Sequence, residues 1–436
     1  MKLIITAKDT ELRLKETNQV SVTSNSGVIT LNPQKTFQTM LGFGGAFTES
    51  ACYNLYRVNK EVREKALRLY FDKEEGIGYT LGRVSIHSSD FSLYSYTYID
   101  EGDKELKTFD ISHEFKFVIP TIKRAQEIAG TEIKLLGSPW SPAPFMKDNN
   151  SPIRGGKLLP EYMQSWANYY KRFIQEFRKA GLNIWGITVQ NEPQAVQRWD
   201  SCIYSGEEER DFVKNYLGPT IKKGDTKDVN ILIWDHNRDI MVERAKAVLN
   251  DKKASKYVWG TAFHWYVSEA FDEVGKTHEL FPDKGLLFSE GCIEGAHLIG
   301  RWENGERYAR NMIGDINNYC EGYIDWNLFL DELGGPNHVN NLCSAPIILR
   351  IFNEQIFLES SYYYIGHISK FVKPGAKRIE KIGSSSLNDV AFVNPNGEIV
   401  YVALNETDND VKSSVSVFNK TYEFEVPKHS IITLVI

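Results

Sequence analysis

Two glutamates stand at the ends of short segments that are otherwise almost free of charge. Glu192 comes after Ile184-Trp-Gly-Ile-Thr-Val-Gln, and Glu290 comes after Leu286-Leu-Phe-Ser. A carboxylate at the end of a buried segment is costly unless it is solvated, paired or functional. Two carboxyl groups in one pocket can act as acid and nucleophile, because repulsion and unequal burial separate their pKa values. The pair predicts cleavage of a glycosidic bond, and two structural ion pairs are the alternative.

Three aromatic residues stand at similar positions, after other short apolar segments. They are Trp140, Tyr266 and Trp326. Aromatic faces stack on the apolar C–H faces of sugar rings, and the polar edge of Trp or Tyr can reach a hydroxyl group. Each residue taken singly is more often part of a core. Around two glutamates, the three together favour a sugar subsite.

Polar residues complete this set. Asp90 and Asn191 are suited to directed hydrogen bonds with sugar hydroxyl groups, and Arg83 is suited to holding one carboxylate ionised. A rival interpretation uses His87, His236 and His264 as ligands of a hydrolytic metal ion. That type of site usually needs further ligands on the first strand, but the segment Gly42-Phe-Gly-Gly-Ala-Phe offers none. We therefore expect no metal ion.

These residues follow short apolar segments that alternate with amphipathic stretches. The predicted strands are Met40–Phe47, Thr80–Ile86, Ile133–Ser138, Ile184–Gln190, Asn230–Trp234, Gly260–Trp265, Leu286–Ser289 and Gly322–Trp326. The predicted helices are Asn59–Phe71, Ser112–Ala129, Pro160–Ala180, Glu207–Leu217, Asp239–Leu249 and Trp302–Tyr319, with a poorly marked helix after the sixth strand. Eight such units predict an α/β fold, a (β/α)8 TIM barrel whose chemistry lies at the carboxyl ends of the strands.

The two chain ends have a different pattern. Short alternating runs occur at Val20–Val22, Val28–Leu31, Val390–Val393, Ile399–Leu404, Val415–Phe418 and Ile431–Ile436, and Asn394-Pro-Asn-Gly marks a hairpin. No helical pattern accompanies them. We therefore predict an antiparallel β-sandwich made from residues 1–38 and 372–436, rigidly attached to a catalytic barrel of residues 39–371.

Composition limits the possible partners and locations. The 436 residues include 51 Lys and Arg against 57 Asp and Glu, so the net charge is −6. Without a basic stripe, nucleic acid is not an expected partner. The apolar run Leu3–Ile5 is too short for a signal peptide, and no segment approaches a membrane span. The five cysteines include no C-x-x-C pair and are expected to be free thiols. We expect a cytoplasmic protein, with export as an effector as the alternative.

The chain resembles glycoside hydrolase family 30 over nearly its whole length, and within it the glucosylceramidases with their bacterial relatives. The matching segments are Leu41-Gly-Phe-Gly-Gly-Ala-Phe-Thr-Glu, Ser89-Asp-Phe-Ser, Tyr96-Thr-Tyr, Ser138-Pro-Trp-Ser-Pro-Ala-Pro-Phe-Met-Lys, Val189-Gln-Asn-Glu-Pro, Phe263-His-Trp-Tyr, Leu287-Phe-Ser-Glu-Gly-Cys, Asp325-Trp-Asn-Leu, Gly334-Gly-Pro-Asn, Ser344-Ala-Pro-Ile and Gly366-His-Ile-Ser-Lys-Phe.

The resemblance implies a retaining β-glycosidase with neither a metal ion nor an organic cofactor. It implies that Glu192 is the acid/base and Glu290 the nucleophile, and that Arg83 steadies the nucleophile. It also implies that sugar is bound in the −1 subsite by Asp90, Trp140, Asn191, Trp326 and Asn341, with His264 and Tyr266 beside Glu290. A barrel with a side β-sandwich from both chain ends is the fold it implies.

The expected substrate is a terminal β-D-glucoside, which can be an oligosaccharide, an aryl glucoside or a glycolipid. A β-1,6-glucanase, a β-xylosidase or a β-fucosidase would share the same chemistry. A binding protein without activity is a different class, and the presence of both glutamates argues against it. The loops Lys147–Leu159, Gln194–Tyr204 and Ile293–Gly305 are expected to surround the aglycone. Sphingolipid metabolism is the process that the glucosylceramidase resemblance implies, without stable membrane insertion.

Overall fold

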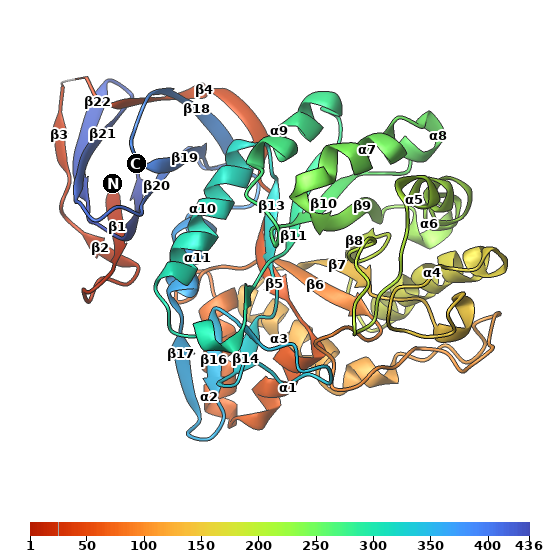
Figure 1. Cartoon of the computed structure of the whole chain (residues 1–436). Helices are drawn as coiled ribbons and strands as arrows, with labels where there is room; N and C mark the ends of the chain where they lie inside the picture. The colour runs from red at the N-terminus through yellow and green to blue at the C-terminus, as the bar shows by residue number, and fades with distance from the viewer. Residues whose placement is uncertain (25) are drawn as a thin grey trace.

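The computed structural model describes residues 1–24 and 26–436, which form two units side by side (Figure 1). One unit is a closed barrel of parallel strands surrounded by helices. The other is a β-sheet that contains strands from both ends of the chain. The predicted combination of a (β/α)8 barrel with a β domain from both termini is confirmed.

The barrel strands coincide with the eight predicted apolar segments. They are β5 (Gly42–Ala46), β6 (Leu81–Ile86), β7 (Lys134–Pro139), β8 (Ile184–Thr188), β9 (Asn230–Asn237), β10 (Gly260–His264), β11 (Gly285–Glu290) and β13 (Gly322–Asp325). Each strand pairs in parallel with the next, and β13 closes the circle on β5. The barrel interior is filled mainly by leucines, at positions 81, 136, 232 and 287. This core sits below the strand ends that carry the polar residues.

Helices cover the outside of the barrel. They are α1 (Glu49–Arg57), α2 (Lys60–Phe71), α3 (Val118–Ala129), α4 (Met163–Lys179), α5 (Gly206–Phe212), α6 (Gly218–Ile221), α7 (Met241–Leu249), α8 (Lys252–Ser255), α9 (Phe271–Leu280), α10 (Glu303–Asn317) and α11 (Ser360–Ser369). The predicted cap Asn59 accepts a hydrogen bond from the Val62 amide at the start of α2. Among the described residues, no helix is long and apolar enough to cross a lipid bilayer.

Some elements departed from the predictions. Helix α1 was not predicted because its buried face includes Glu49, Ser50 and Asn54, which break the apolar pattern. The predicted helix 207–217 is α5 followed by a π-helical turn, Val213–Leu217. Small sheets also follow the barrel strands: β12 (Ile293–Glu294) pairs with β15 (Cys343–Ser344), and β14 (Phe329–Asp331) lies beside β16 (Ile347–Arg350) and β17 (Gln355–Leu358).

The second unit is a single ten-stranded sheet that folds over its own core. Its strands are β1 (Lys2–Ala7), β2 (Lys15–Thr17), β3 (Ser21–Thr23), β4 (Ile29–Thr39), β18 (Lys377–Gly383), β19 (Asn388–Val393), β20 (Ile399–Asn405), β21 (Val411–Val417), β22 (Lys420–Val426) and β23 (Ser430–Val435). The predicted hairpin joins β19 to β20. The pairing is antiparallel except between β4 and β21, which run parallel.

Strand β20 joins the two units because it is buried on both faces. Tyr401 and Ala403 point into the core of the sandwich. Val400 and Val402, on the opposite face, belong to the large cluster that continues into the barrel helices. Since successive side chains of a strand point to opposite faces, one strand closes both cores and holds the units together.

A buried histidine adds a polar link at this junction. His367 on α11 contacts the hydroxyl groups of Thr433 and Thr6 at 2.9 Å each, from its Nδ1 and Nε2 atoms. The Thr433 hydroxyl donates to the carbonyl oxygen of His367 at 2.7 Å. It must therefore accept from Nδ1–H, which leaves Nε2 to accept from Thr6. Burial keeps this ring neutral and lowers the pKa of His367 to about 3.

We predict that His367→Gln lowers the free energy of unfolding by about 1–3 kcal/mol at pH 7, because buried polar groups lose their partners. An unfolded histidine has a pKa near 6.5. Between that value and the folded pKa of about 3, the unfolded wild-type chain takes up a proton that the folded chain does not, so wild-type stability falls with falling pH. The difference in unfolding free energy between wild type and His367→Gln, measured by urea unfolding, should be smaller at pH 4 than at pH 7. His297→Gln, at an exposed histidine, is the control. If the stability difference between wild type and His367→Gln is the same at pH 7 and pH 4, the prediction is contradicted.

Candidate active site

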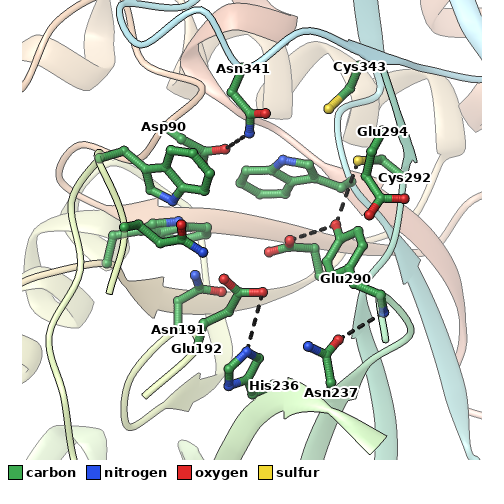
Figure 2. A pocket seen from close by; sticks show the side chains of 15 residues that line it. Asp90, Asn191, Glu192, His236, Asn237, Glu290, Cys292, Glu294, Asn341 and Cys343 are labelled. Atoms are coloured by element: carbon green, nitrogen blue, oxygen red, sulfur yellow. Dashed lines mark hydrogen bonds and ion pairs between the residues drawn. The ribbon is translucent and has the colours of Figure 1, made fainter. Parts of the chain in front are cut away.

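The carboxyl ends of the barrel strands surround a cavity of about 330 Å³ (Figure 2). The predicted site residues that line it are Asp90, Trp140, Asn191, Glu192, Tyr266, Glu290, Trp326 and Asn341. Arg83 and His264 are completely buried behind this wall and contact the glutamates from beneath. The fold thus gathers every residue that the sequence singled out for the site, while their catalytic roles stay predictions.

Glu192 and Glu290 approach each other closely in this cavity. Glu290 is the last residue of β11, and Glu192 lies beyond the end of β8. One carboxylate oxygen of each lies within 4.8 Å of the other. Glu192 has a left-handed backbone (φ 47°), and its N–H donates to the Asp235 carbonyl oxygen at 2.9 Å. Such strain persists only where surrounding contacts hold it, and it is common in active sites.

Arg83 holds the Glu290 carboxylate from the barrel interior. Its guanidinium donates to Glu290 Oε2, to Asn191 Oδ1 at 2.9 Å, to Asp235 Oδ2 at 2.9 Å and to Ser138 Oγ at 3.0 Å. Burial opposes the charge of Arg83, but the carboxylates of Asp235 and Glu290 outweigh burial and raise its pKa. The cation therefore stays charged and fixes one oxygen of Glu290 in place.

Tyr266 fixes the other oxygen. Its hydroxyl group donates to Glu290 Oε1 at 2.8 Å. Burial raises the pKa of Tyr266 well above 10, so the hydroxyl keeps its proton and remains a donor. With one donor on each oxygen, Glu290 has a defined orientation toward the cavity.

Glu192 has two histidine neighbours instead, of which His264 is the cation. His264 Nδ1 lies 3.4 Å from Glu192 Oε1, and His236 Nε2 lies 3.8 Å from the same oxygen. Burial opposes protonation of His264, but Glu290, Asp235 and Glu192 raise its pKa to about 9. Burial by itself would raise the pKa of Glu192, but the hydrogen bond from His264 and the histidine charges lower it overall. Glu192 is therefore ionised at neutral pH in the free enzyme.

A β-bulge brings Asp235 into this network. Strand β9 pairs with β10 through Trp234 opposite Ala262 and then His236 opposite Phe263, which leaves Asp235 as the extra residue. Trp234 and Asp235 both have positive φ, at 73° and 55°. Bulges beside active sites commonly redirect one side chain. Here the bulge turns the Asp235 carboxylate into the barrel.

The Asp235 carboxylate is the central acceptor beneath the cavity. Besides Arg83, it accepts from Thr188 Oγ1 and Ser289 Oγ at 2.6 Å each, and from His264 Nε2 at 3.0 Å. Burial opposes its charge, but the cation of Arg83 and these donors hold the pKa of Asp235 well below its usual range. Asp235 directly follows the predicted strand Asn230–Trp234, but the sequence analysis assigned it no role. The sequence feature that could have indicated its role is the presence of hydroxyl residues, Thr188 and Ser289, at the ends of other barrel strands.

Two indoles stack beside Arg83. The rings of Trp140 and Trp326 lie 5.2 Å apart between centroids and are inclined by 22°. The guanidinium carbon of Arg83 lies 4.8 Å and 5.5 Å from their centroids. Buried cations attract indole faces, so the same group that holds Glu290 also positions both tryptophans.

Asp90 and Asn341 form a polar pair on another wall of the cavity (Figure 2). The Asn341 side-chain amide donates to Asp90 Oδ2 at 2.9 Å. Burial and the charge of Glu290 raise the pKa of Asp90 to about 8. In the free enzyme at pH 7, Asp90 therefore carries a proton for much of the time and can donate to a hydroxyl group as well as accept from one.

The predicted aglycone loops contribute further lining residues that sequence reasoning did not identify. Gln197 and Trp199 come from the loop 194–204, and Glu294 comes from the loop 293–305. His236, Asn237, Cys292 and Cys343 also line the cavity. Loop side chains have no periodic pattern, so their spacing in the sequence does not reveal which of them face inward.

Lys147 ties two of these loops to the barrel. Its buried ammonium group donates to Ser141 Oγ at 2.9 Å and to the carbonyl oxygens of Ser151 and Ser201 at 2.7 Å each. Burial lowers the pKa of Lys147 to about 8. The loop that carries Trp199 is therefore anchored from below, which makes this part of the cavity well defined.

The histidines of the metal interpretation are not gathered into one site. His87 contacts the Tyr169 hydroxyl at 2.8 Å and the Ser141 carbonyl oxygen at 2.7 Å, so both ring nitrogens have partners. Burial lowers the pKa of His87 to about 4, and its surroundings are those of a core residue. His236 and His264 instead face Glu192.

Comparison with known proteins agrees with this geometry. Residues 40–372 match the model of the glycosyl hydrolase family 30 TIM-barrel domain, and residues 375–434 match the family 30 beta sandwich domain. The mouse lysosomal acid glucosylceramidase is 35% identical over 418 residues, which cover 91% of this chain and 81% of that protein.

Two solved structures superpose on nearly the whole chain. SrfJ from Salmonella typhimurium has a TM-score of 0.95 at 36% identity, covering 100% of this chain and 99% of the other. The endo-β1,6-glucanase BT3312 has a TM-score of 0.90 at 33% identity, with the same coverage of 100% and 99%. With both domains matched, the chain belongs to glycoside hydrolase family 30.

Proposed function

We propose that this glycoside hydrolase cleaves terminal β-D-glucosides with retention of the anomeric configuration, in the manner of a glucosylceramidase. The observation that carries retention is the separation of the two carboxylates, whose nearest oxygens lie within 4.8 Å. Retaining enzymes hold their carboxyl groups about 5–5.5 Å apart, whereas inverting enzymes leave about 6.5–9.5 Å for a water molecule. The 35% identity to the mouse glucosylceramidase supports the choice of glucoside.

In the first step, the Glu290 carboxylate attacks the anomeric carbon while Glu192 gives its proton to the departing glycosidic oxygen. The bond to the aglycone breaks and a glycosyl ester forms on Glu290. Arg83 and Tyr266 suit Glu290 to this role because they hold its two oxygens. The sugar displaces water from the cavity, which strengthens the effect of burial and favours the protonated form of Glu192.

In the second step, Glu192 is a carboxylate again and accepts a proton from water as the oxygen of that water attacks the anomeric carbon. The ester bond to Glu290 breaks, and the sugar leaves with its original configuration after two inversions. His264 suits Glu192 to this basic role because its positive charge favours the ionised carboxylate.

A second candidate is endo-hydrolysis of a β-1,6-glucan. It is favoured by the likeness to BT3312, which covers the whole chain at a TM-score of 0.90. Gln197, Trp199 and Glu294 would then contact a second sugar ring rather than another aglycone. The two candidates share their chemistry and differ only on this side of the cavity.

We predict turnover of aryl β-D-glucosides and release of ceramide from glucosylceramide, with little activity on aryl β-xylosides and β-fucosides. Product analysis over this panel, with a β-1,6-glucan included, provides the measurement. Activity confined to the glucan would favour the second candidate, and activity confined to another sugar would contradict the proposed glucoside specificity.

We predict that Glu290→Gln and Glu192→Gln each lower kcat by about 1000-fold or more, because each removes a group that acts on the reacting atoms.

Glu290→Ala with azide should give the α-glycosyl azide from a reactive aryl β-glucoside. Glu192→Ala with azide should give the β-glycosyl azide, because the ester on Glu290 still forms. Product configuration by NMR spectroscopy distinguishes the roles. Glu294→Gln, a carboxylate in the same cavity, is the control and should change kcat by less than about 10-fold; an exchanged pattern of products would contradict the assignment.

We predict that His264→Gln moves the alkaline limb of the kcat/KM profile upward by about one pH unit. The kcat/KM profile reports the ionisation of the free enzyme, so its alkaline limb follows the pKa of Glu192. His264 lowers that pKa in the wild type, and its removal lets the pKa rise. Profiles that begin well below pH 4 and extend to pH 9 on an aryl glucoside test this shift, with His278→Gln on α9 as the matched control. A limb that stays in place or moves downward would rule out this influence of His264.

A further inference from the structure

Two cysteine side chains line the cavity next to the glutamates. Cys292 follows Glu290 closely in the chain, and Cys343 lies on β15. Both side chains line the cavity and are only 2% exposed (Figure 2). The other free cysteines, at positions 52, 202 and 320, belong to the barrel core cluster instead. The cavity therefore contains a pair of thiols for which the proposed hydrolysis has no use.

Strand pairing places the two thiols on one face of a small sheet. Strands β12 and β15 are antiparallel, with Ile293 opposite Ser344 and Glu294 opposite Cys343. By the same register Cys292 is the diagonal neighbour of Cys343, so both side chains lie on the same face of this sheet. Diagonal neighbours have Cα atoms about 7–8 Å apart. Unstrained disulfides need about 4.4–6.8 Å, so this arrangement does not favour a direct sulfur–sulfur bond.

An ion between the sulfurs fits this arrangement better. A metal–thiolate bond is about 2.3 Å long, so a bridging ion spans a wider gap than a disulfide does. Zn²⁺ would require further ligands, usually four in total. Among the described residues, the one set of three His, Cys, Asp or Glu ligand atoms close enough to share an ion is Glu192, His264 and Glu290, which includes neither thiol. A pair of thiolates without further ligands favours a soft ion that accepts two ligands.

We propose that Cys292 and Cys343 bind one soft, two-coordinate monovalent cation of the Cu⁺ or Ag⁺ class, and that the bound ion inhibits hydrolysis. On binding, each sulfur forms a bond to the ion and each thiol releases one proton to solvent. The neutral dithiol becomes a complex with one net negative charge. No electron is transferred, so no oxidant or reductant is needed.

The inhibition follows from the position of Tyr266. Its hydroxyl oxygen lies 3.6 Å from Cys292 Sγ and 2.8 Å from Glu290 Oε1. A metal-bound thiolate is a stronger acceptor than a thiol, so it competes with Glu290 for the one proton of this hydroxyl. The added negative charge also lies in the same low-dielectric cavity as the nucleophile. Glu290 thus loses a hydrogen bond that fixes its orientation, and the ion occupies space in the cavity.

Silver titration of the reduced, full-length protein tests the binding step without depending on any substrate. In a chloride-free buffer, the wild type should bind one Ag⁺ per chain tightly and release two protons, as measured by calorimetry in buffers of different ionisation enthalpy. Cys343→Ser and Cys343→Val should each weaken this binding at least 100-fold. Cys202→Ser, which removes a core thiol, should bind as the wild type does. Equal binding by the Cys343 variants and the wild type would overturn the proposed site.

Hydrolysis of an aryl β-glycoside tests the inhibition, with each protein compared with its own activity before the ion is added. One equivalent of Ag⁺ should reduce wild-type activity at least tenfold but leave more than half of the activity of Cys343→Val. Full activity of the silver-bound wild type, or equal inhibition of Cys343→Val, would overturn the proposal. Peroxide treatment of the reduced wild type should leave Cys292 and Cys343 unlinked in peptide mass spectra. A disulfide between them, seen as a linked peptide that has lost two hydrogens, would contradict the ion site.

Discussion

The arrangement of the site depends on one buried cation. Arg83 lies inside the barrel with no exposed surface, where an unpaired guanidinium would be very costly. Asp235 and Glu290 balance its charge, and Ser138 and Asn191 accept its remaining hydrogen bonds. Because the guanidinium is planar and rigid, these partners are fixed relative to one another. A shift of β6, β9 or β11 would leave a buried charge unpaired, so the network holds these strand ends in one position.

This network also explains why the backbone is strained at the mouth of the barrel. Glu192, Trp234, Asp235 and Asn327 all have positive φ. Each such residue costs about 1–3 kcal/mol and persists only when its surroundings require it. At Asp235, the surroundings are two cations and two hydroxyl groups that would otherwise lack a partner. The pairing of buried charges and hydrogen-bonding groups thus outweighs local backbone preferences at the carboxyl ends of the barrel strands.

The same competition determines what could be predicted from the sequence. Barrel strands were predictable because burial on both faces produces continuous apolar runs, and the residues after them then fall at one end of the barrel. Glu192 and Glu290 were found by this argument. Asp235 was not, because a bulge reverses the direction of one side chain through tertiary hydrogen bonds that leave no periodic pattern. The approach of Cys343 to Cys292 likewise depends on pairing between segments that are distant in the chain.

Specificity rests on a different part of the molecule from the chemistry. The acid pair and its cation are held by barrel strands, whose positions the packing of both units fixes. Trp199 and Glu294 reach the cavity from loops, which accept changes in sequence without disturbing the strands. A glucosylceramidase and an endo-β1,6-glucanase can therefore both be about a third identical to this chain over their aligned residues. Identity of that degree reflects the shared scaffold. Under the proposed function, the loop residues that this scaffold leaves free to vary are the ones that select the leaving group.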